Sequence, residues 1–253
     1  MAGQINGQIV EEPVVKISIC LTNFNRSKLL FESVSNVLLD NRVGEVIISD
    51  DCSRDEVFNS VVWYFKEFPK VKIHRNETNL DCYRNKAKAL ELATNDWCIL
   101  FDSDNVMDKS YLDRIENLVI GGVSDKTIYT PSFARPHFDF SSVAGVNISR
   151  SNVAGLAHSD KVTTMLNAAN YFVNRHEYLK VFNPDIDPVT SDSIYMMSRW
   201  LESGNSIYVV PDLSYQHRVN NHGAEEGSHY GSNVRRTPSG FHDSIITKLK
   251  QMK

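Results

Sequence analysis

The stretch Trp97-Cys98-Ile99-Leu100-Phe101-Asp102-Ser103-Asp104-Asn105 decides the fold, because an apolar run passes directly into two carboxylates. The apolar run predicts a buried β-strand. In open α/β sheets, ligands bind beyond the carboxyl ends of the strands. An Asp-x-Asp pattern on its own is more often a solvated acidic turn. Directly after a buried strand, it indicates a site for a cation or another polar ligand.

Further strand-then-helix units precede this stretch. Apolar runs predict strands at 14–21, 43–49, 71–75 and 97–101, and amphipathic patterns predict helices at 27–38, 55–68, 83–93 and 109–119. This alternation predicts an α/β fold with a mostly parallel, Rossmann-like central sheet and helices on both faces.

The second half of the chain has a less regular pattern. It predicts strands near 127–132, 170–173 and 207–210 and a helix at 191–202, while residues 133–165 have a polar, loop-like composition. Residues 1–12 predict a disordered tail. Residues 219–253 predict a flexible loop or lid and a C-terminal segment, since 217–240 are rich in Gly, Asn and His.

Composition and charge argue against a nucleic-acid-binding or membrane-spanning protein. The chain has 253 residues, a formal net charge of -4 and four cysteines without a CxxC pair. This charge gives no basic footprint for nucleic acid. No apolar run approaches the roughly 20 residues of a membrane span, and the start of the chain lacks a signal-peptide pattern. These features predict a cytoplasmic protein with free thiols and no transmembrane segment.

Polar residues cluster at the predicted strand ends. They are Thr22-Asn23-Phe24-Asn25-Arg26, Asp50-Asp51, Asn79-Leu80-Asp81 and Asp102-Ser103-Asp104. Because successive parallel strands end at one edge of a sheet, we expect these side chains to converge on one crevice. Mg²⁺ and Mn²⁺ prefer oxygen ligands and often share them with substrate phosphates, so the Asp-x-Asp element predicts a divalent metal on a diphosphate.

The ordered set of motifs resembles the family 2 glycosyltransferases, which have the GT-A fold. The similar segments are 15–26, 46–53, 79–86, 101–105, 167–175, 191–204 and 215–218. Cys52 and Asp81 stand where that family usually has Gly, and Ser191 stands where Glu is usual. The loop around Asp81 is also two residues shorter than the family's pattern.

This resemblance implies roles for individual residues. The nucleotide-sugar donor would be contacted by Thr22, Asn23, Asn25, Arg26, Asp50, Asp51, Arg84, Asp102 and Ser103. Among these, Asp51 and Arg84 would contact the nucleobase. The metal would be bound by Asp102, Asp104 and His217, and Asp192 would be the general base. The alternatives are helix capping for Asp50, Asp51 and Asp192 and a structural or exposed role for His217.

The implied function is that of an inverting, metal-dependent glycosyltransferase. It would move a sugar from a nucleotide-diphosphate sugar, with UDP favoured, to a hydroxyl of a glycan, a lipid-linked sugar or a protein, using Mn²⁺ or Mg²⁺. Residues 13–218 would form the GT-A domain, with a nucleotide-binding half at 13–120 and an acceptor-side, catalytic half at 121–218.

Two alternatives stay open. The segment around Asp102 also resembles the nucleophile motif of haloacid-dehalogenase-like phosphatases, although Asp212 lacks the neighbouring acid that such enzymes need. A non-catalytic module that binds nucleotide-sugar or glycan would keep the donor pocket and lose nothing when Asp192 is changed.

Overall fold

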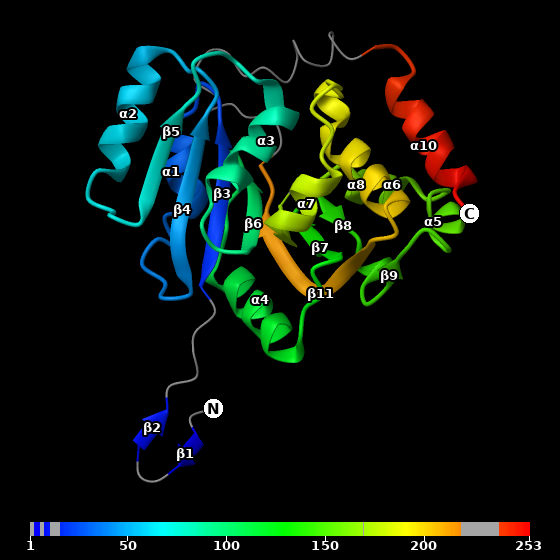
Figure 1. The fold of residues 1–253 in the computed structure, drawn as a ribbon, viewed down its shortest axis with the longest axis horizontal. Coiled ribbons are helices and arrows are strands. Elements are labelled where there is room, and N and C mark those ends of the chain that lie inside the picture. The colour runs from blue at the N-terminus through cyan, green and yellow to red at the C-terminus, as the bar shows by residue number, and fades with distance from the viewer. Residues whose placement is uncertain (1–2, 6–7, 11–15, 169, 219–237) are drawn as a thin grey trace.

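The computed structural model describes residues 3–5, 8–10, 16–168, 170–218 and 238–253. Its centre is a nine-stranded sheet with the order β5-β4-β3-β6-β10-β7-β11-β9, and β8 pairs with β7. Figure 1 shows this sheet running through the molecule, with helices α3, α7 and α8 in front of it.

The first half contains the four predicted strand–helix units. The strands are β3 (Ile17–Asn23), β4 (Val43–Asp50), β5 (Val71–Arg75) and β6 (Trp97–Asp102), and they are mutually parallel. The helices are α1 (Lys28–Val34), α2 (Asp55–Phe65), α3 (Asp81–Leu92) and α4 (Lys109–Gly121). Every residue of β3 is buried, which explains its continuous apolar run, because a central parallel strand is covered on both faces.

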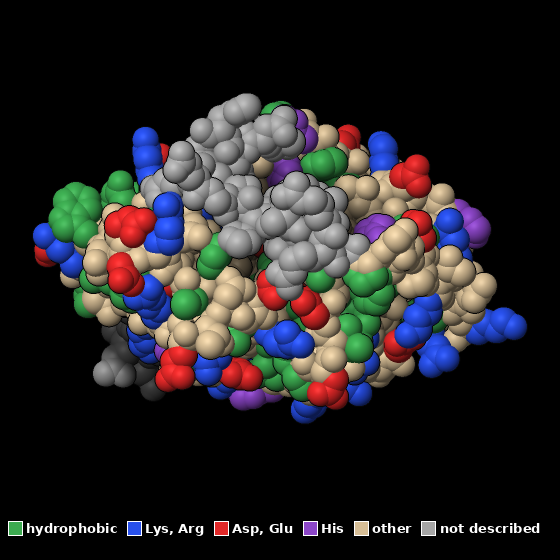
Figure 2. Space-filling model, turned by 90° about the horizontal axis from the view of Figure 1, so that it is seen from above, with side chains coloured by type: hydrophobic (Ala, Val, Ile, Leu, Met, Phe, Trp, Pro, Cys, Tyr) green, Lys and Arg blue, Asp and Glu red, His purple; other side chains and the backbone are tan. Residues whose placement is uncertain are grey.

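The second half makes the sheet mixed. Strand β10 (Tyr171–Asn174) is antiparallel to both of its neighbours, β6 and β7 (Thr127–Arg135). Strand β11 (Ser206–Gln216) then pairs in parallel with β7. The sheet is therefore parallel in the first half and antiparallel around β10. Strands β3, β6, β7 and β11 consequently end at one edge. Figure 2 shows the molecule from above, with acidic, basic and histidine side chains distributed over that face.

The region at 133–165, interpreted from sequence as loops, contains short elements. They are β8 (Phe138–Asp139), η1 (Ser141–Val143), β9 (Asn147–Ile148), α5 (Val153–Leu156) and α6 (Asp160–Leu166). Their brevity gives too few periods for a pattern to be visible in the sequence. Further on are α7 (Arg175–Val181), η2 (Val189–Ser191) and α8 (Asp192–Glu202).

The two ends of the chain add small elements. Strands β1 (Gly3–Ile5) and β2 (Gln8–Val10), within the predicted tail, pair as an antiparallel hairpin. Helix α10 (Phe241–Gln251) packs against α5 and α8. Most of the predicted lid, residues 219–237, lies outside the described residues. None of the described helices is long and apolar enough to cross a membrane.

Candidate active site

Asp50, at the end of β4, ties the neighbouring loops together. Its fully buried carboxylate accepts hydrogen bonds from Asn23 Nδ2 at 2.8 Å and from Ser53 Oγ at 2.6 Å. The Ser53 backbone N–H also donates to it at 3.1 Å. A buried carboxylate with this many donors is a structural junction. Of the two adjacent acids, Asp50 therefore supports the loops, and Asp51 stays the candidate for contact with a ligand.

Asp51 lies beside the start of α3. Its Oδ1 accepts hydrogen bonds from the Leu80 backbone N–H at 2.7 Å and from Asn76 Nδ2 at 3.0 Å. Burial raises the pKa of the Asp51 carboxyl to about 6, against the lowering effect of these bonds. A desolvated carboxyl with a raised pKa in a strand-end crevice is a common feature of ligand sites.

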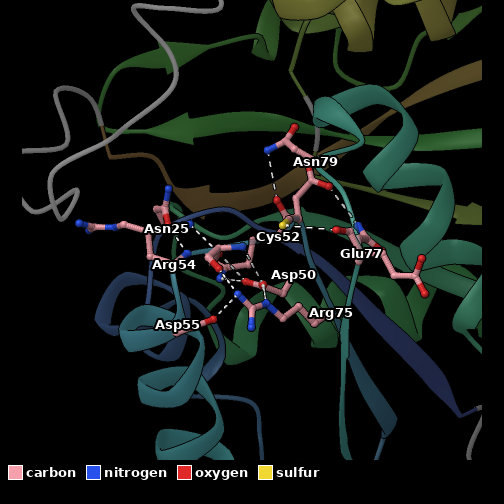
Figure 3. A network of polar contacts seen from close by, with 12 residues as sticks. Asn25, Asp50, Cys52, Arg54, Asp55, Arg75, Glu77 and Asn79 are labelled. Carbon is pink, nitrogen blue, oxygen red and sulfur yellow. Dashed lines mark hydrogen bonds and ion pairs between the residues drawn. The ribbon is translucent and has the colours of Figure 1, made fainter.

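Asn25 and its neighbours form the network in Figure 3. The Asn25 backbone N–H donates to Ser53 Oγ at 2.8 Å, and its Oδ1 accepts from the Arg54 backbone N–H at 2.9 Å. Arg75 joins β5 to α2 through an ion pair with Asp55 at 2.8 Å. Asn25, predicted to contact the donor, thus also fixes the turn after β3.

Both carboxylates of the Asp-x-Asp element face a cation of the protein. Asp104 Oδ2 lies 3.1 Å from an Arg26 guanidinium nitrogen, and the same guanidinium donates to Ser103 Oγ at 3.3 Å. Asp102 Oδ1 lies 3.6 Å from Lys86 Nζ. Burial raises the pKa of Asp102, and Lys86 acts in the opposite direction. The side chains of Asp102 and Asp104 are 30% and 22% exposed, so both can be reached by a ligand.

His217 follows β11, and its ring packs among aromatic rings. The ring centroid lies 5.2 Å from that of Phe138 and 6.0 Å from those of Tyr215 and His137. Burial lowers the pKa of His217, which favours the neutral imidazole. Its Nδ1 is buried and has no hydrogen-bond partner among the described residues. An orphaned ring nitrogen near Asp104 is compatible with the predicted metal role.

Even so, the part of the chain that the structure describes contains no group of three or more His, Cys, Asp or Glu side chains arranged to hold a metal ion. Asp102, Asp104 and His217 therefore do not form a closed metal cage. Mg²⁺ and Mn²⁺ rarely need one, since they keep waters and take phosphate oxygens as ligands. Two accessible carboxylates at the strand ends fit an ion that is shared with a diphosphate.

Asp192 starts helix α8 and is almost fully buried. Its Oδ2 accepts a hydrogen bond from Lys86 Nζ at 2.6 Å. Lys86 lies on α3 and also reaches Asp102, so the predicted base and the predicted donor-side acid flank one ammonium group. Burial lowers the pKa of Lys86, but the carboxylates of Asp192 and Asp102 outweigh it and hold the pKa well above its usual value.

Lys86 is the functional candidate that sequence reasoning missed. The signal was present, because Tyr83, Lys86, Ala87 and Leu90 lie on one buried face of α3. A lysine within the apolar stripe of an amphipathic helix is rarely buried without a carboxylate partner. The partner could not be identified from sequence, since it lies 106 positions away.

Two predicted donor contacts lie near the same edge. Thr22, the last residue but one of β3, pairs with Asp102 in the strand register. Arg84 Nε donates to the Pro184 carbonyl at 3.1 Å, across the gap between α3 and the loop that follows α7. The structure thus brings Thr22, Asp51, Asp102 and Asp104 to one edge, and it places Arg84 at the rim between the two halves.

Comparison with known proteins agrees with this arrangement. The family model of glycosyl transferase family 2 matches residues 18–137. The match covers just under half of the chain and supports the predicted resemblance to glycosyl transferase family 2. Curated relatives are the abequosyltransferase RfbV of Salmonella typhimurium, 33% identical over 38% of this chain, and an uncharacterized glycosyltransferase of Haemophilus influenzae, 29% identical over 46%. The matched stretches cover 30% and 38% of those relatives' own lengths.

Solved structures share the fold of this chain. TarS 1-349 from S. aureus, solved in complex with UDP-GlcNAc, is similar over 92% of this chain and 71% of its own, with a TM-score of 0.63 and 16% identity. The mannosyltransferase PcManGT from Pyrobaculum calidifontis, solved with GDP-Man and Mn²⁺, covers 93% and 69%, with a TM-score of 0.61 and 16% identity. The predicted GT-A fold is confirmed.

Proposed function

We propose that this chain transfers a sugar from a nucleotide-diphosphate sugar, with UDP favoured, to an acceptor hydroxyl with inversion at the anomeric carbon. The observation that carries the proposal is the placement of Asp192 and Asp102 on either side of Lys86, at 2.6 and 3.6 Å. A base and a donor-binding acid this close fit a reaction in which an acceptor oxygen attacks a sugar attached to a diphosphate.

The donor side is built from Asp51 and the Asp-x-Asp element. The carboxylate of Asp51 would accept a hydrogen bond from a nucleobase N–H at the end of β4. Asp102 and Asp104, with the ring of His217 as a further candidate ligand, would hold Mn²⁺ or Mg²⁺. When bound, such an ion supplies Lewis-acid stabilisation of negative charge on the departing diphosphate. TarS, solved with UDP-GlcNAc, and PcManGT, solved with GDP-Man and Mn²⁺, support a donor of this class.

Asp192 would act as the general base. The acceptor hydroxyl gives its proton to the Asp192 carboxylate while its oxygen forms a bond to the anomeric carbon. The bond from that carbon to the diphosphate oxygen breaks, and its electron pair leaves with the diphosphate. A carboxylate suits this step, because the hydroxyl becomes acidic only late in the displacement and positioning matters more than basicity. The acceptor would be a glycan, a lipid-linked sugar or a protein hydroxyl.

Calorimetric titration with UDP, with and without Mn²⁺, tests the donor site. We expect the wild type to bind UDP more tightly with Mn²⁺, and Asp104→Ala to lose that dependence on metal. Asp160→Ala is the matched control, since Asp160 is an exposed acid on α6. If neither UDP nor GDP binds with Mn²⁺ present, the donor site is assigned wrongly, and phosphatase activity that depends on Asp102 becomes the next assay.

A further inference from the structure

Lys86 is almost completely buried between the two halves of the molecule, and its side chain is only 5% exposed. Its ammonium group donates to Asp192 Oδ2 at 2.6 Å and to Ser193 Oγ at 3.2 Å. Asp102 Oδ1 lies further away, at 3.6 Å. Lys86 therefore hydrogen-bonds to the first residues of α8, whereas its interaction with Asp102 of the Asp-x-Asp element is electrostatic only.

The position of Lys86 is fixed by its chain neighbour. Asn85 Oδ1 accepts hydrogen bonds from Ser49 Oγ at 2.6 Å and from Asn76 Nδ2 at 3.0 Å. Its Nδ2 donates to the Ser49 carbonyl at 3.0 Å. These buried bonds pin α3 to the end of β4. Because Asn76 Nδ2 also donates to Asp51 at 3.0 Å, one polar network extends from the proposed nucleobase site to the residue before Lys86.

Without a cation, the arrangement of acids would be unfavourable. Asp102 and Asp192 carry like charges in a site that is partly closed to water, where repulsion between them is weakly screened. A buried carboxylate needs a charged or hydrogen-bonding partner. Lys86 supplies that partner for Asp192 from the opposite half of the molecule.

We propose that Lys86 is a positioning residue that holds Asp192 in place for proton transfer and compensates charge on both sides of the reaction. This inference rests on the proposed function. As the acceptor proton moves to Asp192, that carboxylate becomes neutral, while negative charge grows on the diphosphate. Lys86 lies between Asp192 and the donor. When Asp192 becomes neutral, the positive charge of Lys86 is no longer compensated there, and it stabilises the negative charge on the diphosphate. A fixed cation needs no reorganisation to do this.

The test compares Lys86→Met with the wild type and with Lys88→Met. Met keeps the length of the side chain without its charge, and Lys88 lies on the same helix in a more exposed ion pair with Glu91. The probe is release of UDP from UDP-GlcNAc, UDP-glucose or UDP-galactose with water as the acceptor, in Mn²⁺. We expect kcat of Lys86→Met to fall by about 10²-fold, within the range for loss of general-base catalysis, while KM and the Kd for UDP change less than about 3-fold. Lys88→Met should match the wild type.

The double variant Lys86→Met with Asp192→Asn separates positioning from an independent role. If Lys86 acts through Asp192, the double variant should be no slower than Asp192→Asn alone, because residues that act as a unit have non-additive effects. Losses that multiply would overturn the inference, and so would a Lys86→Met enzyme that hydrolyses donor as fast as the wild type. A large loss of UDP binding in Lys86→Met would make Lys86 a donor ligand instead.

Urea unfolding of the wild type, Lys86→Met, Asp192→Asn and the double variant gives a measurement that needs no substrate. Lys86→Met leaves the Asp192 carboxylate without its cation, so it should destabilise the fold, and adding Asp192→Asn should recover part of the loss. Absence of this recovery would show that the pair is not formed in solution, and the inference would fall. If the wild type binds no UDP and hydrolyses no donor, the proposed function itself fails, and UDP calorimetry distinguishes that outcome.

Discussion

The two halves of the sheet hold their polar residues in different ways. In the first half, Asp50 accepts hydrogen bonds from Asn23, at the end of the neighbouring strand β3, and from Ser53, in the loop that follows β4. In the second half, Asp192 takes its short ion pair from Lys86, across 106 positions of sequence. The donor side is thus internally supported, whereas the proposed base depends on a residue from the other half.

From this difference we infer how the site is assembled. Parallel strands joined by crossover helices place their end residues at one edge by topology alone, so the proposed donor side forms when those units fold. The proposed base, Asp192, comes into position only when α8 packs against α3. Changes in the second half should therefore act on chemistry, and changes at Asp50 should act on the fold.

The largest expected effect is that of Asp192→Asn. Removing the proposed base should lower donor hydrolysis by about 10²- to 10⁴-fold, while UDP binding with Mn²⁺ stays close to that of the wild type. Asp243→Asn is a matched control, because Asp243 is also an acid in the first turn of a helix, α10. Unchanged hydrolysis in Asp192→Asn would show that Asp192 is not the base, and another residue would have to take that role.

Asp50→Ala should act on stability instead. It leaves the buried Asn23 amide and Ser53 without their acceptor, which should cost about 2–4 kcal/mol of unfolding free energy. Urea unfolding measures this loss. Asp55→Ala serves as the control, since it removes only an exposed ion pair with Arg75 and should cost no more than about 1 kcal/mol. Equal losses in the two variants would contradict the view that Asp50 supports the donor half from within.

A smaller effect should appear in the pH dependence of folding stability and of UDP affinity, through Asp51 in the donor half. Burial raises the pKa of Asp51 from 3.8 to about 6. Between these values the folded state keeps a proton that the unfolded state has lost, so the stability contributed by Asp51 falls as pH rises from 3.8 through 6. A nucleobase N–H donates best to the ionised carboxylate, so UDP affinity should rise over the upper part of that window and level off above about pH 7. In Asp51→Asn both dependences should flatten, as calorimetry and urea unfolding across that range would show.

The first half of the molecule could be predicted from the sequence better than the second half. The apolar runs of β3, β4 and β6 indicated the parallel strands, and the acids behind them indicated the strand-end site. Strand direction has no signature in periodicity, so the antiparallel setting of β10 was not visible. The partners of Asp192 and Asp104, Lys86 and Arg26, depend on tertiary packing between distant segments. Arg26 was predicted to contact the donor, and its ion pair with Asp104 is an added finding.

Two positions of the donor half have a larger residue where the family usually has Gly. Cys52 and Asp81 both adopt left-handed backbone, with φ of 62° and 63°. For a residue other than glycine this backbone conformation costs about 1–2 kcal/mol. Glycine avoids that cost, but it loses more conformational entropy on folding, which offsets part of the gain. Cys52→Gly should therefore stabilise the fold by about 0.5–1 kcal/mol in urea unfolding.

Asp81→Gly should gain less, because Asp81 is also a favourable acid in the first turn of α3. Its charge nevertheless helps to raise the pKa of Asp51, next to the dominant effect of burial. Asp81→Gly should accordingly move the midpoint of pH-dependent UDP binding to lower pH, while Cys52→Gly leaves it in place. A shift in both variants would mean that the glycines change the shape of the crevice, and a shift in neither would mean that Asp51 does not control the affinity.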